Sequence, residues 1–224
     1  MSSYAAAVAD LNTTGYAILC QLALRPCNTY ELNRELQRNA RYFAPRAESR
    51  IYTEVKSLER RGLVRAQAGA TGRRPKLTYR LTSAGGLALE AWLRGPARPF
   101  SLECEAVLRL LVAARTTPET LLADLDTVIA QCNELLEGVR PAIAQEYAEG
   151  RAPFQADAHA RALIFDFITS YHLALRDWAE RSRAAVLRWP STAPTPRTVE
   201  EGLETIAKAA ERGAAGRRRS AGGG

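Results

Sequence analysis

Residues 58–86, LERRGLVRAQAGATGRRPKLTYRLTSAGG, run from the end of an amphipathic helix through two extended segments into the start of another helix. The extended segments, 63–68 and 76–81, flank a loop of glycine, proline and basic residues. This pattern is typical of a β-hairpin with a basic tip. Beyond the hairpin, Thr82 or Ser83 can cap a further helix. The apolar residues of that helix are Leu87, Leu89, Trp92 and Leu93.

Three helices are expected before the hairpin. Either residue of Thr13-Thr14 can cap the first helix, and either residue of Asn28-Thr29 can cap the second. Pro45 suits the first turn of the third helix, which runs to about Arg61 before Gly62 offers a left-handed stop. Three helices, a basic hairpin and a fourth helix in this order predict a winged helix, in which the third helix enters the major groove of DNA.

The third helix has two chemically different faces. At about 100° per residue, the apolar side chains Ile51, Val55 and Leu58 fall on one side. The opposite side carries hydrogen-bond donors that suit base edges or phosphates, and Tyr52 lies on the flank, where its hydroxyl could meet a phosphate. Because any amphipathic surface helix has a polar face, solvated side chains are the alternative interpretation. The expected DNA-facing residues are Arg46, Ser49, Thr53, Lys56 and Arg60.

The hairpin adds a second group of cations. Arg73, Arg74 and Lys76 lie at or beside its tip, where positive side chains can approach the DNA backbone or the minor groove. A solvated basic turn is the alternative. We expect Tyr52 and these three residues to hold the backbone. The residues expected to face bases are Arg46, Ser49, Thr53 and Lys56.

Several short stretches occur in a characteristic order. They are Tyr30-Glu31-Leu32, Arg41 to Ser49, Arg50-Ile51-Tyr52, Leu58 to Val64, Gly72-Arg73-Arg74, Tyr79 to Gly85, and Trp92-Leu93. From about Leu11 to Leu93 the chain resembles the DNA-binding domain of the PadR family of transcriptional regulators. The helical remainder resembles the variable C-terminal half of that family only in pattern. One departure is Thr53, where many members have proline after the Ile-Tyr pair.

The resemblance implies a winged helix-turn-helix domain followed by a helical dimerisation domain. Members of the family are mostly repressors that dimerise through their C-terminal helices, and some release DNA when a phenolic acid or a drug-like molecule binds. By this resemblance the expected partners are double-stranded DNA, a second copy of the chain, and a small-molecule effector.

Charge and linkers divide the chain into parts. Residues 1–95 carry a net charge of +8, residues 96–212 carry −4, and three arginines follow in the tail. A basic module joined to a mildly acidic one suggests that the first meets a polyanion. We expect a mainly α protein with a small β-hairpin: a winged-helix domain in 1–95, a helical dimerisation or effector domain in 96–189, and a last segment in 190–224. That last segment combines a Pro-rich linker, a short helix capped by Thr198, and a disordered basic tail.

The helical half contains a candidate dimer contact. Helices are expected over 102–114, from Thr117-Pro118 onward, and over about 157–188, with a kink or break near Pro141. In the middle helix, apolar residues recur at spacings of four and three, as in a helix that packs along a partner helix. The partner is either a second subunit or another helix of the same chain. A two-fold dimer would predict an inverted-repeat operator. The seam consists of Leu121, Leu125, Val128, Cys132, Leu135 and Val139.

Small-molecule chemistry is less marked. Asp166, Tyr171, His172 and Trp178 share the last long helix, so a polar and aromatic effector pocket is conceivable, with an ordinary core as the alternative. The only histidines are His159 and His172, and no catalytic motif, metal-ligand spacing or dinucleotide fingerprint occurs. We therefore expect no enzyme, no cofactor and no metal.

Compartment signals are equally plain. The four scattered cysteines predict reduced, mostly buried thiols, and no signal peptide or membrane span is recognised. The composition thus favours a cytoplasmic, bacterial protein without a membrane partner. The leading hypothesis is a homodimeric, sequence-specific repressor. The alternative is a winged-helix adaptor whose basic face docks an acidic protein without specific DNA binding.

Overall fold

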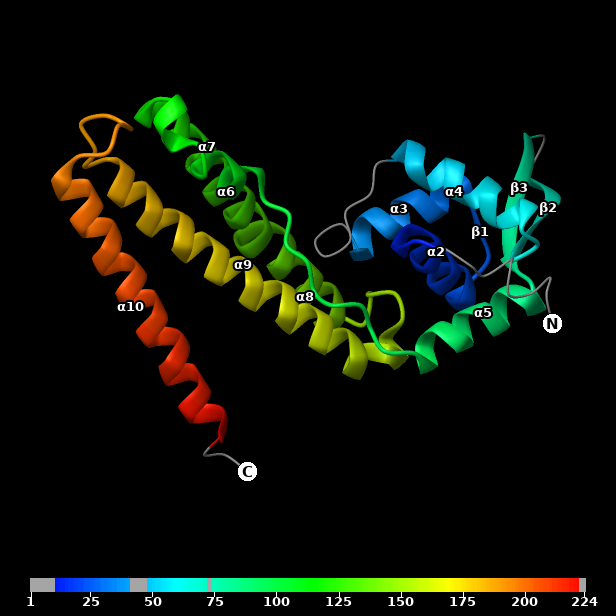
Figure 1. Ribbon diagram of the computed structural model, residues 1–224. Coiled ribbons are helices and arrows are strands. Elements are labelled where there is room, and N and C mark those ends of the chain that lie inside the picture. The colour runs from blue at the N-terminus through cyan, green and yellow to red at the C-terminus, as the bar shows by residue number, and fades with distance from the viewer. Residues whose placement is uncertain (1–10, 41–47, 72–73, 222–224) are drawn as a thin grey trace. The chain divides into compact units, whose positions relative to one another are not determined.

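The computed structural model describes residues 11–40, 48–71 and 74–221, and the chain forms two compact units, Met1–Phe100 and Ser101–Gly224 (Figure 1). The described part is mainly helical with one three-stranded antiparallel sheet, which confirms the expected fold class. Each unit has its own hydrophobic cluster. Within the described segments, no helix combines the length and the apolar character needed to cross a bilayer.

The helices of unit 1 begin at polar caps. They are α2 (Thr13–Leu24), α3 (Thr29–Ala40), α4 (Glu48–Arg60) and α5 (Ser83–Arg94). The cap of α2 is Asn12 and not Thr13 or Thr14, because the Asn12 side chain accepts a hydrogen bond from the Gly15 amide at 3.0 Å. Asn28 caps α3 as expected: its side chain accepts from the Glu31 amide, while the Glu31 carboxylate accepts from the Asn28 amide at 3.1 Å.

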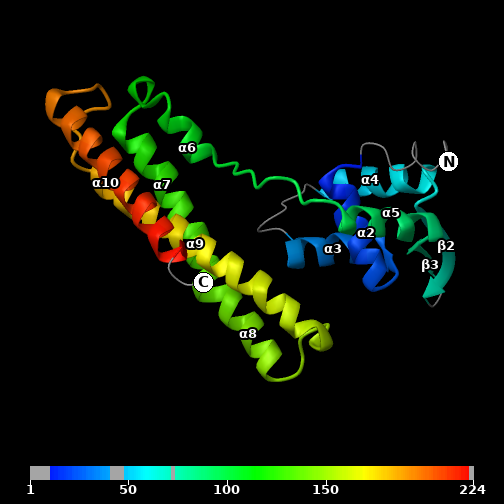
Figure 2. The same cartoon turned by 60° about the horizontal axis from the view of Figure 1, so that its bottom comes forward.

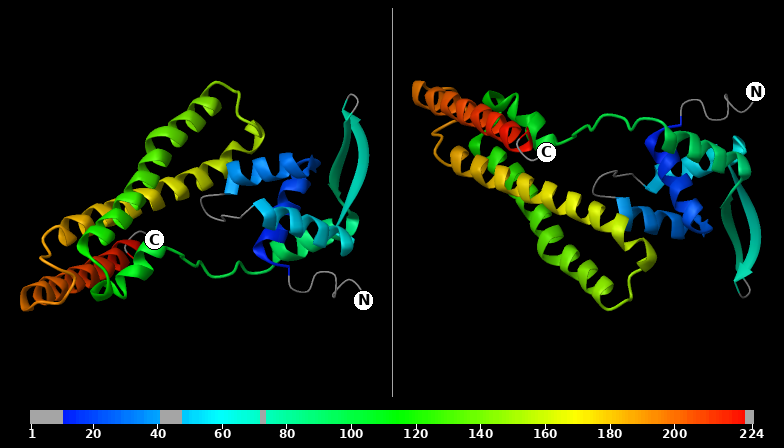
Figure 3. Two further views of the ribbon diagram at one scale, coloured as in Figure 1. Left: turned by 90° about the horizontal axis from the view of Figure 1, so that it is seen from above. Right: turned by 90° about the horizontal axis from the view of Figure 1, so that it is seen from below.

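The sheet is longer than the sequence suggested. Strands β2 (Val64–Thr71) and β3 (Arg74–Leu81) pair antiparallel along their whole lengths, and β1 (Cys27–Asn28), which was not expected, pairs on the other side of β3. The expected seven-residue loop is wrong, because Gly69 to Thr71 pair with Arg74 to Lys76 although these segments contain glycine and proline. Both views of Figure 3 show these two long strands standing out from the helices of their unit.

Two glycines connect α4, the sheet and α5. Gly62 has φ of 72°, so it provides the expected left-handed stop after α4. Gly85 lies so close to the turn before β2 that a Cβ there would stand 2.1 Å from the Leu63 carbonyl oxygen. The Thr82 hydroxyl donates to the carbonyls of Gly62 and Leu63 and accepts from the Gly85 amide, which caps α5. These contacts join the end of α4 to the root of the hairpin.

Unit 2 is a set of long helices joined by short turns (Figure 2). Its α-helices are α6 (Glu105–Leu110), α7 (Pro118–Asn133), α8 (Arg140–Ala148), α9 (Ala158–Val186) and α10 (Pro196–Ala221), with 3₁₀ turns at Ala113–Arg115 and Gln155–Asp157. Two expectations need correction here. The helix predicted over 102–114 spans only the six residues Glu105–Leu110, and Cys104 at its start makes no side-chain cap bond. The disturbance expected near Pro141 appears as a π-helical segment, Glu134–Val139, just before it.

The predicted dimer seam lies inside unit 2. Helix α7 packs along α9, and its residues form one buried cluster with Ala179 and Val186. Val139, the last member of the seam, is half-buried. Within one chain, the contact with α9 is enough to account for the spacing. The buried members of the seam are Leu121, Leu125, Val128, Cys132 and Leu135.

The end of the chain also differs from expectation. In place of a short helix and a disordered tail, α10 continues from Pro196 to Ala221. Its cap is Thr195 and not Thr198: the Thr195 hydroxyl accepts from the Thr198 amide, and the Thr198 hydroxyl accepts from the Thr195 amide at 2.9 Å. The segment is rich in alanine, glutamate and basic residues, which favour helix strongly enough to carry its few glycines.

Candidate nucleic-acid interface

Helix α4 is fixed in unit 1 by its apolar face. Ile51, Val55 and Leu58 are fully buried in the unit 1 cluster. On the flank, the Asn12 amide of the α2 cap donates to the Glu54 carboxylate at 3.1 Å. The helix therefore presents its opposite face from a rigid support, which is what reading base edges requires.

The opposite face of α4 carries the side chains that the sequence predicted. Ser49, Thr53, Lys56 and Arg60 are all exposed, and the helix period brings them to one side. Arg46 lies outside the described residues. Arg50 is also exposed beside this face and was not among the predicted contacts, although its helical position could have suggested it. We call Ser49, Thr53, Lys56 and Arg60 the outer face of α4.

Local hydrogen bonds determine which donors and acceptors of these side chains remain for DNA. The Thr53 hydroxyl donates to the Ser49 carbonyl at 2.9 Å, so a lone pair and the methyl group remain for a base. Arg60 Nε donates to the Lys56 carbonyl at 3.4 Å, which folds its stem along the helix. The half-buried Tyr52 hydroxyl has a pKa above its ordinary value, first because of desolvation and then because of its hydrogen bond to Glu48.

The hairpin contributes a second basic surface. Arg74 and Lys76 belong to β3, but Arg73 lies outside the described residues and the side chains of the other two are not described. Further from the tip, Arg65 and Arg80 stand directly opposite each other on β2 and β3, and both are exposed. Sequence reasoning missed this pair, which strand alternation and register would have revealed. Like charges placed opposite each other repel, so a phosphate between them would be stabilising.

The four residues of the candidate effector pocket do not converge on one point. Tyr171 and His172 meet edge to face, with ring centroids 5.2 Å apart. Asp166 is exposed, and Trp178 packs against the unit 2 cluster. The His172 ring bonds the Ile168 carbonyl at 2.8 Å, and burial lowers its pKa.

Next to this pair lies a buried cation that sequence reasoning missed. Arg140 donates to the Thr169 hydroxyl at 3.0 Å and to the Phe165 carbonyl, and its guanidinium stacks on the Phe165 ring. The sequence signal was weak, because Arg140 only precedes a proline in an otherwise ordinary helix.

Known proteins resemble this chain in sequence and in fold. The model of the transcriptional regulator PadR-like family matches residues 18–91. Bacillus subtilis PadR bound to operator DNA is structurally similar, with 19% identity, a TM-score of 0.65, and coverage of 79% of this chain and 99% of that one. The same protein bound to p-coumaric acid gives 18% identity, a TM-score of 0.55, and coverage of 80% and 100%.

A third similar structure is the Vibrio cholerae virulence activator AphA, with 20% identity, a TM-score of 0.57, and coverage of 77% and 96%. No curated protein sequence matched the chain. The structural likenesses, all at low identity, show a shared fold. The match over residues 18–91 assigns the domain that holds α4 and the hairpin to the transcriptional regulator PadR-like family, whose members are DNA-binding regulators.

Proposed function

We propose that this protein is a homodimeric, operator-specific transcriptional repressor acting in the bacterial cytoplasm. The single observation that carries the proposal is the outer face of α4, where exposed polar and cationic side chains stand opposite a fully buried apolar anchor. In this proposal Arg46, Ser49, Thr53 and Lys56 face bases. The backbone is held by Tyr52, Arg60, Arg73, Arg74 and Lys76 together with the opposed pair Arg65 and Arg80.

A homodimer is part of the proposal because one α4 reads only a short half-site. A two-fold dimer doubles the contacts and predicts an inverted-repeat operator with half-sites about one helical turn apart, roughly 34 to 36 Å. Unit 2 supports such a dimer because it exposes large apolar side chains on several helices. Among them are Val107, Leu108, Leu111, Leu163, Ile164 and Phe167.

Release by a small aromatic acid completes the proposal. Bacillus subtilis PadR is seen with p-coumaric acid, and in this chain Tyr171 and His172 lie beside the buried Arg140, a combination that suits a carboxylate on an aromatic ring. Addition of p-coumaric acid to the protein–operator complex is the direct probe. If this part of the proposal holds, DNA affinity falls with added acid, and a Tyr171→Phe variant needs more acid for the same effect.

The test of the central claim is an anisotropy titration. The DNA is the segment upstream of the protein's own gene, compared with a random duplex of equal length at two salt concentrations. An operator-specific regulator prefers its own DNA by about a thousandfold or more at physiological salt. Equal affinity for both duplexes would favour the protein-docking adaptor instead. A reporter joined to the same promoter separates repression from activation.

A further inference from the structure

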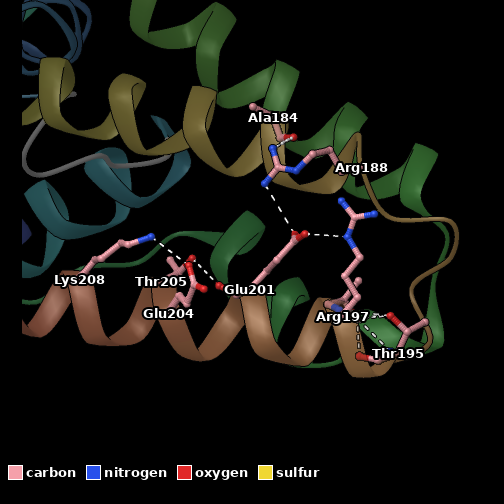
Figure 4. Close-up of polar contacts among 9 residues, drawn as sticks. Ala184, Arg188, Thr195, Arg197, Glu201, Glu204, Thr205 and Lys208 are labelled. Carbon is pink, nitrogen blue, oxygen red and sulfur yellow. Dashed lines mark hydrogen bonds and ion pairs between the residues drawn. The ribbon is translucent and has the colours of Figure 1, made fainter.

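Helix α10 has an ionic face, and one residue of that face contacts the segment just after α9. Arg197 Nε pairs with Glu201 at 3.0 Å, and Lys208 pairs with Glu204 at 3.1 Å (Figure 4). Glu201 also approaches Arg188, just after the end of α9, at 3.9 Å. Because these residues share one side of the helix, the side of α10 that faces Arg188 is its ionic side.

The other side of α10 is apolar and exposed. Val199, Leu203 and Ile206 recur at spacings of four and three, and their side chains are 49%, 63% and 67% exposed. Every residue from 202 to 212 is exposed. Ala210 continues the same row, and the small residues Gly202, Ala207 and Ala209 flank it. We call Val199, Leu203 and Ile206 the α10 stripe.

The composition of α10 indicates what covers this stripe. A 3–4 spacing with small flanking residues is the pattern of a helix that approaches another helix closely. A membrane surface would instead call for a strongly basic polar face. From 196 to 212, however, three basic residues face four glutamates, and the arginines at 217–219 lie beyond the stripe. The occupant is therefore a helix with an apolar row of its own.

Unit 2 offers such a row on the first half of α9. Leu163, Ile164 and Phe167 lie within two turns of each other and are all exposed. The α10 stripe of the same chain does not reach them. The contact between Arg188 and Glu201 places the start of α10 beside the end of α9, and Phe167 lies 21 residues before Arg188, about 30 Å of helix. Ile206, by contrast, follows Glu201 by only five residues.

We propose that the α10 stripe of one subunit packs against the partner subunit's α9 row of Leu163, Ile164 and Phe167. Two apolar rows that cannot meet within one chain meet twice in a two-fold dimer, because an isologous interface makes each contact reciprocally. The proposal rests on the homodimer proposed above and deepens it, because α10 of each subunit packs on the other subunit.

The test measures the dimer dissociation constant of the full chain by sedimentation velocity over a concentration series. Leu203→Glu and Phe167→Lys each place a charge in the proposed contact and should raise this constant at least tenfold, since each change acts at both reciprocal contacts. Thr205→Glu adds the same charge to the polar side of α10 and should change the constant less than twofold. The double variant Leu203→Glu with Phe167→Lys should recover most of the lost affinity. Circular dichroism confirms folding of each variant.

The remaining outcomes overturn the proposal in distinguishable ways. If Leu203→Glu dimerises like the wild type, α10 is not at the interface, while the homodimer itself stands. If Leu203→Glu weakens the dimer but Phe167→Lys neither weakens nor rescues it, α10 docks elsewhere and the α9 contact is wrong. A wild-type chain that stays monomeric up to the highest concentration of the series would remove both this contact and the proposed homodimer.

Discussion

At the scale of single residues, Lys56 is the most direct test of DNA reading. Its side chain is exposed on the outer face of α4 between Thr53 and Arg60. Lys56→Ala should weaken binding to the operator by about tenfold to a hundredfold, as expected for one base-edge contact of roughly 1–3 kcal/mol, and should relax sequence preference at one position. An anisotropy titration against the operator and single-base variants measures both effects.

The matched control for Lys56 is Lys208→Ala, which removes the same charge from the polar face of α10. Lys208 pairs with Glu204 and belongs to unit 2, so operator affinity should stay within about twofold of the wild type. A third variant, Arg74→Ala, should weaken all duplexes alike and reduce the salt slope by about one unit. Unchanged binding by both Lys56→Ala and Arg74→Ala would contradict the proposed docking.

Adjacent glycines of α5 give a prediction about stability. At Gly85 an added Cβ meets backbone, 2.1 Å from the Leu63 carbonyl oxygen, so Gly85→Ala forces α5 and β2 apart. We expect a loss of about 2–4 kcal/mol in the free energy of unfolding of unit 1. At Gly86 nothing lies within 4 Å of an added Cβ, and Gly86→Ala should stabilise α5 by about 0.5–1 kcal/mol. Urea unfolding of both variants checks the pair, and equal effects would contradict this packing.

At the scale of elements, the apolar spacing of α7 is compatible with a partner helix in the same chain or in a second subunit. Leu125 is buried against α9, so Leu125→Ala should lower the free energy of unfolding of unit 2 by about 2–4 kcal/mol. Since the contact is internal, the loss should not depend on protein concentration. The control Leu187→Ala makes the same change at an exposed site and should cost less than about 1 kcal/mol. A loss that vanishes at high protein concentration would indicate that Leu125 lies in a subunit interface.

Helix α9 gives a prediction about pH. Desolvation by burial lowers the pKa of His172 below its ordinary value of 6.5, the hydrogen bond with the Ile168 carbonyl partly opposes this, and Arg140 lowers the pKa further. Because the folded state holds this histidine neutral, protonation below the unfolded pKa stabilises the unfolded state more than the folded state. Stability should therefore fall as pH drops below about 6.5, and His172→Gln should remove this part of the fall. Thermal unfolding from pH 7.5 to 5.5 measures it, and parallel curves for the two proteins would contradict the assignment.

Element order was readable from the sequence because caps and periodicity are local. Asn28, Gly62 and Thr82 act as their residue types predict, and the core and outer faces of α4 follow from the helical period alone. Cross-strand pairing is not local: β1 is only two residues long, and the pairing of Gly69 with Lys76 overrides the loop propensity of that segment. Likewise, the spacing of α7 does not say which chain its partner helix belongs to; within one chain α7 packs along α9.

At the scale of the whole molecule, the two parts of the chain differ both in net charge and in the surfaces that they expose. The basic N-terminal part carries α4 and the hairpin, whereas the mildly acidic helical part carries the apolar rows of α9 and α10. The length of α10 was missed because its glycines and terminal arginines resemble a disordered tail in composition. Which face of α10 is apolar could have been read from Val199, Leu203 and Ile206, but that this face is left exposed required the contact between Glu201 and Arg188.

The dimer ties operator spacing to subunit association. If two α4 helices are held about one DNA turn apart, inserting five base pairs between the half-sites turns one of them to the opposite side of the duplex, out of reach of the second helix. Affinity should then fall to that of a single half-site, about a hundredfold or more, while the Lys56→Ala loss is retained because one α4 still reads its bases. The Leu203→Glu variant should lose the same affinity on the intact operator and gain nothing further from the insertion. Gel-shift titrations of both proteins on both duplexes measure this, and an insertion that leaves wild-type affinity unchanged would mean that each subunit binds alone.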